Sequence, residues 1–149
     1  MITAIAVAAT AAVVGIVAAL IQRRTQAHAL PARMGPTVPG QLHRRDFVRP
    51  DAEWLVVLFS STTCETCATV WSKCQPLESE SVAVQNVTYQ NDRALHDRYA
   101  IDSVPLVTVA DSEGVVLSSF AGPIGASELW AAVAAVRDAG TATRPGSAE

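Results

Sequence analysis

The distribution of apolar residues divides the chain into an N-terminal hydrophobic stretch, a mixed segment and a region of alternating patterns. Residues 2–21 carry no charge and consist largely of Ala, Val, Ile and Leu. As a helix, such a stretch is about 30 Å long, which is enough to cross a bilayer. We therefore expect a transmembrane anchor over residues 1–22. Because Pro and Gly interrupt residues 23–50, we expect a linker there.

A cleaved signal peptide is the alternative interpretation of the first stretch, since Ala27-His28-Ala29 looks like a cleavage site. The anchor is favoured because no basic residue precedes the apolar core, and because Arg23 and Arg24 separate that core from the cleavage site. The positive charges follow the stretch, so the positive-inside rule places the domain on the cytoplasmic side of the cell membrane. The extracytoplasmic side is the alternative.

Residues 51–139 alternate between short apolar runs and helical periodicity. The hairpin composition of Asp111 to Gly114 indicates that the last two strands are antiparallel neighbours. The order β-α-β-α-β-β-α indicates an α/β domain with a mixed sheet and flanking helices, followed by a disordered tail at 140–149. The pattern predicts strands at 54–60, 82–89, 106–110 and 115–120, and helices at 64–75, after a cap at Asn91 or Asp92, and at 127–138.

The last helix is expected to begin at Ser127, as its N-cap, and to end near Gly140. Trp71, on the first helix, is expected to be a core residue. The spacing along the last helix predicts a buried stripe of four apolar residues, which are Leu129, Trp130, Val133 and Val136.

Length and charge limit the functional classes. A chain of 149 residues has room for one small domain beside the anchor, and we expect it to be a monomer. The net charge is −3 and no basic patch is interleaved with aromatic residues, which argues against nucleic-acid binding. No second cysteine pair completes a zinc site and His28, His43 and His96 are scattered, so neither a metal nor an organic cofactor is expected.

Two of the three cysteines carry the candidate chemistry. Cys64 and Cys67 form a C-x-x-C pair that follows the first strand and opens a helix. This spacing brings the sulfurs within bonding distance, and the helix N-terminus favours a thiolate on the first one. Cys64 is therefore the expected nucleophile and Cys67 the resolving thiol. Cys74 is interpreted as a core residue, because it lies too far along the helix to bridge Cys67.

These features together resemble the thioredoxin family. The resemblance rests on Cys64-Glu65-Thr66-Cys67, on Val104-Pro105 before a strand and on Phe120-Ala121-Gly122 after the hairpin, and it covers residues 53–138. It implies a thioredoxin-like fold with a cis peptide bond at Pro105, facing the C-x-x-C pair. It also implies that the backbone of Val104 pairs with an extended substrate segment.

The chain departs from the family at several positions. Typical reductases of the family carry Trp before the first cysteine and Gly-Pro between the two, where this chain has Thr63 and Glu65-Thr66. The family's buried Asp falls at Leu58, and its lysine partner falls near Asn86. The resemblance therefore does not extend to proton transfer through that charged pair.

Glu65 is the departure with the clearest electrostatic consequence. A carboxylate one residue from the nucleophile opposes the thiolate, which would raise the pKa of Cys64 and make the disulfide a weaker oxidant. The alternative is that Glu65 points into solvent, where its effect on that pKa is a few tenths of a unit. His96 is expected to be an exposed residue rather than a proton relay.

The leading hypothesis is a membrane-tethered thiol–disulfide oxidoreductase that exchanges the Cys64–Cys67 pair with a partner protein, in the reducing direction. Its electrons would come from an unidentified dithiol protein. The alternative is a thioredoxin-fold binding or scaffold module at the membrane, with little redox turnover. A third interpretation is delivery of sulfur or of a soft metal through the two thiolates.

Overall fold

The computed structural model describes residues 36–143, with side chains to residue 140. The predicted anchor at 1–22, the linker up to residue 35 and the tail from residue 144 lie outside these residues. Within residues 36–143, no helix combines the length and the apolar character that a membrane span requires. The compact unit to which these residues belong begins at Pro36.

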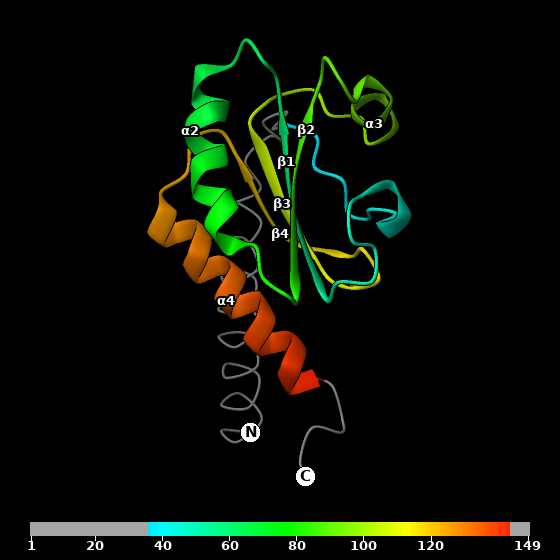
Figure 1. Ribbon diagram of the computed structural model, residues 1–149, viewed down its shortest axis with the longest axis vertical. Coiled ribbons are helices and arrows are strands. Elements are labelled where there is room, and N and C mark those ends of the chain that lie inside the picture. Colours follow the sequence, from blue (N-terminus) through cyan, green and yellow to red (C-terminus); the bar gives the residue numbers. More distant parts are fainter. Residues whose placement is uncertain (1–35, 144–149) are drawn as a thin grey trace, which may run out of the picture. The chain divides into compact units, whose positions relative to one another are not determined.

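Four strands form one mixed sheet in the order β2-β1-β3-β4 (Figure 1). β1 (Trp54–Ser60) is parallel to β2 (Val82–Thr88) and antiparallel to β3 (Leu106–Ala110). β3 is antiparallel to β4 (Val116–Ala121), as the hairpin turn predicted. The predicted strands are confirmed to within one residue at their ends. All seven residues of the central strand β1 are buried, which explains its unbroken apolar sequence.

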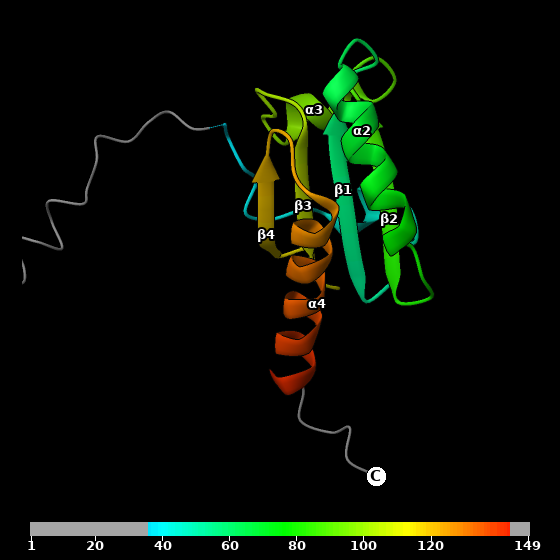
Figure 2. The same ribbon diagram turned by 90° about the vertical axis from the view of Figure 1, so that its left-hand side faces the viewer.

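Helices lie on both faces of this sheet. α2 (Glu65–Cys74) and α4 (Ala126–Thr143) cover one face, and α3 (Arg93–Arg98) lies on the other (Figure 1 and Figure 2). Two short 3-10 turns, η1 (Arg44–Asp46) and η2 (Gln75–Leu77), complete the elements. The predicted order β-α-β-α-β-β-α is confirmed. The buried core under α2 and α4 consists of Trp54, Val56, Leu58, Val70, Cys74, Val82, Val84, Val107, Val109, Ile124, Leu129 and Val133.

α4 differs from the prediction at both ends. It begins at Ala126, so Ser127 is not its N-cap, and it continues through Gly140 to Thr143. A Cβ atom on Gly140 would lie 2.4 Å from ring carbon Cη2 of Trp54. Glycine at this position therefore admits the close packing of the Trp54 ring instead of ending the helix.

The prediction of a buried stripe on α4 is correct for Leu129 and Val133, and Val136 is partly buried against the same core. The prediction is wrong for Trp130, which is 44% exposed. One residue along a helix turns the side chain by about 100°, which carries Trp130 away from the direction of Leu129. Its indole Nε1 instead donates a hydrogen bond to the carbonyl of Lys73 in the last turn of α2, at 2.8 Å.

Residues 36–53, here called the strap, cover part of the sheet face opposite α2 and α4. Leu42 is fully buried and Phe47 is nearly so, in a core that also contains Leu55, Val57 and Phe59. The compact unit therefore includes residues 36–50, which were expected to belong to the linker before a domain starting at residue 51. An irregular segment of this kind has no periodicity that would predict its burial.

Hydrogen bonds attach the strap to the rest of the domain and hold its own turn together. The backbone N–H of Leu42 donates to the carbonyl of Gly114 at 2.7 Å. Gly114 has a φ of +84°, and a Cβ atom there would lie 1.9 Å from the carbonyl oxygen of Leu42, so glycine is required. Within the strap, the buried guanidinium of Arg44 donates to the carbonyls of Arg49, Pro50 and Ala52.

Replacing Leu42 by Ala should lower the free energy of unfolding by about 2–4 kcal/mol, because the substitution leaves a cavity under the strap. Val48→Ala is the matched control in the same segment, since Val48 is 46% exposed, and it should change that free energy by less than about 0.5 kcal/mol. Urea unfolding of the whole chain, followed by tryptophan fluorescence, measures both. An effect of Leu42→Ala as small as that expected of Val48→Ala would show that burial of Leu42 does not stabilise the domain.

Candidate active site

Three loops lie at one end of the sheet. Ser60, the last residue of β1, is the Cα partner of Thr88, the last residue of β2. Phe59 is the Cα partner of Leu106, the first residue of β3. The loops that follow β1 and β2 and the loop that precedes β3 therefore share this edge. They carry residues 61–63, 89–91 and 103–105.

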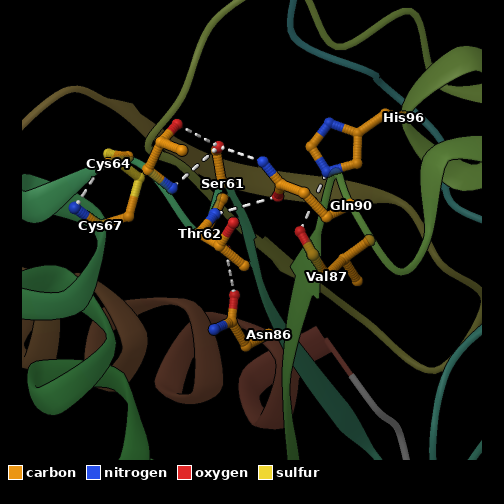
Figure 3. The surroundings of a disulfide bond; sticks show 10 residues. Ser61, Thr62, Cys64, Cys67, Asn86, Val87, Gln90 and His96 are labelled. Carbon is orange, nitrogen blue, oxygen red and sulfur yellow. Dashed lines mark hydrogen bonds between the residues drawn. A yellow bond between two sulfur atoms is a disulfide. The ribbon is translucent and has the colours of Figure 1, made fainter.

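Cys64 is the N-cap residue of α2, and its sulfur accepts a hydrogen bond from the backbone N–H of Cys67 at 3.1 Å. The two cysteines form a disulfide bond, with Cα atoms 5.3 Å apart (Figure 3). Cys64 is partly exposed, whereas Cys67 is only 3% exposed. The accessible sulfur thus lies at a helix N-terminus, where free N–H groups and the helix dipole favour negative charge.

The loop before Cys64 is hydrogen-bonded to Gln90, which was not among the predicted site residues. The N–H of Thr62 donates to Oε1 of Gln90 at 3.0 Å, and Nε2 of Gln90 donates to the hydroxyl of Ser61 at 2.9 Å (Figure 3). That hydroxyl also accepts from the N–H of Thr63 at 3.3 Å. The sequence signal for Gln90 was its place as a polar residue just after β2, the strand that pairs in parallel with β1.

The peptide bond between Val104 and Pro105 is cis, as the resemblance implied. Pro105 is buried and Val104 is partly exposed. Just before them, the carboxylate of Asp102 accepts hydrogen bonds from the hydroxyl of Thr37 at 2.7 Å and from the N–H of Thr37 at 3.1 Å. These bonds lower the pKa of Asp102. The strap is thereby tied to the loop that contains the cis bond.

Leu58 and Asn86, at or near which the resemblance placed the family's charged pair, are Cα partners across β1 and β2. Leu58 is fully buried in the core under α2 and α4. The side-chain oxygen of Asn86 accepts a hydrogen bond from the hydroxyl of Ser60, which is 2% exposed. The structure therefore has an apolar residue and an uncharged hydrogen-bonded pair at this place. Ser60 was not among the predicted site residues.

The prediction that His96 is exposed is wrong, because its side chain is 2% exposed. Its ring lies edge-on to Phe59 and to Tyr89, with centroid distances of 5.5 Å in both cases. Its Nε2 lies 3.0 Å from the carbonyl oxygen of Val87. His96 therefore packs as an aromatic core residue of α3 with its polar nitrogen paired. Glu65, by contrast, is exposed in the first turn of α2.

Cys74 is a free thiol that is fully buried in the core under α2 and α4. Burial raises its pKa to about 11, against the opposing effect of the nearby Lys73 charge. This placement agrees with the predicted packing role. Within residues 36–143, there is no group of three or more His, Cys, Asp or Glu side chains that could hold a metal ion.

Comparisons with known proteins establish the fold of the described domain. No protein-family model matches the sequence. No curated protein matches it either. A single-substitution mutant of thioredoxin from Halobacterium salinarum NRC-1 superposes with a TM-score of 0.52 at 18% identity, over 58% of this chain and 76% of that protein.

Two further thioredoxins give similar values. The germline-specific thioredoxin Deadhead of Drosophila melanogaster has a TM-score of 0.51 at 24% identity, over 58% of this chain and 84% of its own. The short form of thioredoxin f from spinach chloroplast has a TM-score of 0.51 at 19% identity, over 67% of this chain and 96% of its own. The described domain has a thioredoxin-like fold, and its C-x-x-C disulfide is consistent with thiol–disulfide exchange.

In the reduced and folded protein at pH 8, iodoacetamide should add to at most two cysteines and should spare Cys74. A pKa of about 11 leaves on the order of one thousandth of the Cys74 thiol ionised at that pH, and the side chain is buried. Mass spectrometry should show a third adduct only after denaturation in guanidinium. Cys74→Ala, the control, should give the same number of adducts as the wild type in the native state and two after denaturation. A third adduct on the native wild-type chain would contradict the packing role.

Proposed function

We propose that this chain is a thiol–disulfide oxidoreductase that exchanges the Cys64–Cys67 dithiol and disulfide with a partner protein. The observation that carries this proposal is the difference in exposure between the two sulfurs. Cys64 is partly exposed at the N-terminus of α2, and Cys67 is buried behind it. A substrate can therefore approach Cys64 first, while Cys67 is held ready for the second step.

In the reducing direction, the Cys64 thiolate attacks one sulfur of a substrate disulfide, which breaks and releases a substrate thiolate. The mixed disulfide is then attacked by Cys67 in its thiolate form. This second step closes the Cys64–Cys67 disulfide and releases the second substrate thiolate. Two electrons pass to the substrate in total, and a partner dithiol protein restores the Cys64–Cys67 dithiol by the same exchange.

The loop with the cis bond provides the proposed contact for the substrate backbone. Leu106 is the Cα partner of Phe59 near the end of β1, so Val104 and Pro105 belong to the sheet edge that carries Cys64. Val104 is partly exposed and can offer backbone groups to an extended segment. We assign Val104 and Pro105 to substrate binding on this basis.

The cellular setting is part of the proposal. Residues 2–21 would anchor a monomeric protein in the cell membrane, with the domain on the cytoplasmic side, where thiols are kept reduced. Reduction of a partner is the natural direction there. A Cys64–Cys67 reduction potential near about −270 mV would support this direction, whereas a value near about −120 mV would favour an oxidant on the extracytoplasmic side.

A thioredoxin-fold binding module at the membrane is the second candidate. The observation that favours it is the fully buried Leu58 at the position of the family's acidic residue. Without a charged group there, the proton of the resolving thiol has no acceptor of that kind in β1. Slow thiol–disulfide exchange suits a protein that holds a client better than it suits an enzyme that turns over many substrates.

Cys64→Ser should abolish reduction of a disulfide-bonded model peptide by the whole chain, because the attacking thiolate is lost. Cys67→Ser should instead accumulate the mixed disulfide between Cys64 and the peptide, since nothing resolves it. Cys74→Ala is the matched control, and it should retain the wild-type rate. Turnover is measured by chromatography of the peptide, and the mixed disulfide by mass spectrometry.

Two outcomes would count against the oxidoreductase. One is a wild-type chain whose Cys64–Cys67 pair forms no reversible couple in defined thiol buffers. The other is a Cys64→Ser variant with unchanged turnover. Client binding that survives Cys64→Ser while mixed disulfides disappear would favour the binding module.

Glu65→Gln should lower the pKa of Cys64 and raise its reactivity at pH 7, because the substitution removes a negative charge one residue from the sulfur. Glu65 is exposed, so the shift should be a few tenths of a unit and should shrink in high salt. The pH dependence of Cys64 alkylation in the reduced chain measures it. Glu78→Gln, at an exposed position beyond the end of α2, is the control. An unchanged or raised midpoint for Glu65→Gln would refute the tuning role.

A further inference from the structure

We propose that Gln90 is a positioning residue for Cys64, which it holds in place through the loop at 61–63. This inference rests on the proposed function, since it concerns the reactivity of the same sulfur. Gln90 lies in the loop after β2, and its exposed side chain reaches the loop after β1 (Figure 3). It therefore connects two segments that are far apart in the sequence and that meet beside the disulfide.

The orientation of the Gln90 amide follows from its partners. The backbone N–H of Thr62 can only donate, so the amide atom that faces it at 3.0 Å must be the oxygen. The amide nitrogen then faces the hydroxyl of Ser61 at 2.9 Å and donates to it. Both ends of one side chain are thus used by two consecutive residues of the loop.

Hydrogen bonds are the main restraint on this loop, because it has little apolar contact. Thr62 and Thr63 are exposed, and Ser61 is only partly buried. The Ser61 hydroxyl that accepts from Gln90 also accepts from the N–H of Thr63 at 3.3 Å, and it lies 3.0 Å from the hydroxyl of Thr63. Gln90 therefore restrains each residue between β1 and Cys64, directly or through Ser61.

The loop in turn sets the position of the reactive sulfur. The N–H of Cys64 donates to the carbonyl of Ser61 at 3.2 Å, and the N-cap conformation of Cys64 directs its sulfur to the N–H of Cys67 at 3.1 Å. A thiolate at Cys64 needs this N–H donor to hold its charge. If the loop moves more freely, the thiolate loses part of this stabilisation, so the pKa of Cys64 rises and its attack slows.

The test compares Gln90→Met with Asn91→Met in the reduced whole chain. Met keeps the length of the Gln side chain and removes both hydrogen bonds. Asn91 is an exposed amide in the same loop, and only its backbone N–H has a hydrogen bond in the described part of the chain, so it is the matched control. Gln90→Met should lower the Cys64 alkylation rate at pH 7 by about threefold and raise its pH midpoint by about half a unit.

A second pair of variants separates loop positioning from general damage. Glu at position 90 can still accept from the N–H of Thr62 and from the hydroxyl of Ser61, so Gln90→Glu should restore the restraint. Its added charge is matched by Asn91→Asp, one residue away. The alkylation rate of Gln90→Glu should therefore equal that of Asn91→Asp, and the thermal unfolding midpoints of all four variants should agree within a few degrees.

Two results would overturn the assignment. One is an alkylation profile of Gln90→Met that matches that of Asn91→Met. The other is a Gln90→Glu variant that is as slow as Gln90→Met when Asn91→Asp is not. Alkylation needs no partner protein, so it tests Gln90 even if the wild-type chain fails to turn over a disulfide substrate.

Discussion

The burial of β1 on both faces is the constraint on which the rest of the domain depends. All seven residues of this strand are buried, and it lies between β2 and β3 in the sheet. A strand of this kind is stable only if other elements exclude water from both of its faces. α2 and α4 do so on one face (Figure 2), and Leu42, Phe47 and α3 do so on the other. The strap is therefore part of the domain because β1 is apolar on both faces.

The same constraint positions the chemistry. Burial ends at Ser60, and the exposed loop that follows leads directly into α2. Val70 and Cys74 pack α2 onto the sheet, which fixes the N-terminus of this helix beyond the end of β1. Cys64 is then the N-cap, while Cys67 faces the interior. The order of attack in the proposed exchange thus follows from how the helix packs.

Local patterns predicted what depends on local physics, such as the apolar run of β1, the hairpin turn after β3 and the start of α2 beside the first cysteine. Contacts between distant segments explain what was missed. His96 packs against β1, and Trp130 donates to the end of α2. Gly140 looks like a helix end, but a tryptophan ring of β1 needs its space. Leu42 is a core residue because it packs against one face of the sheet, and nothing in its local sequence indicates that contact. Gln90 bonds to a loop residue 28 positions away. A single sequence cannot indicate such a contact, because it shows only a polar residue after a strand.

Leu58 shows how stability and chemistry oppose each other at this site. A buried carboxylate costs free energy unless it is paired, whereas a leucine in the same place adds to the core formed with Val56 and Val107. Ser60 and Asn86 satisfy each other nearby without any charge. Under the proposed function, the proton of the resolving thiol must then leave to water or to the departing substrate thiolate. Under that proposal, Leu58 adds to the apolar core where a charged residue would have offered a proton acceptor, and the second step of the exchange should be slower for it.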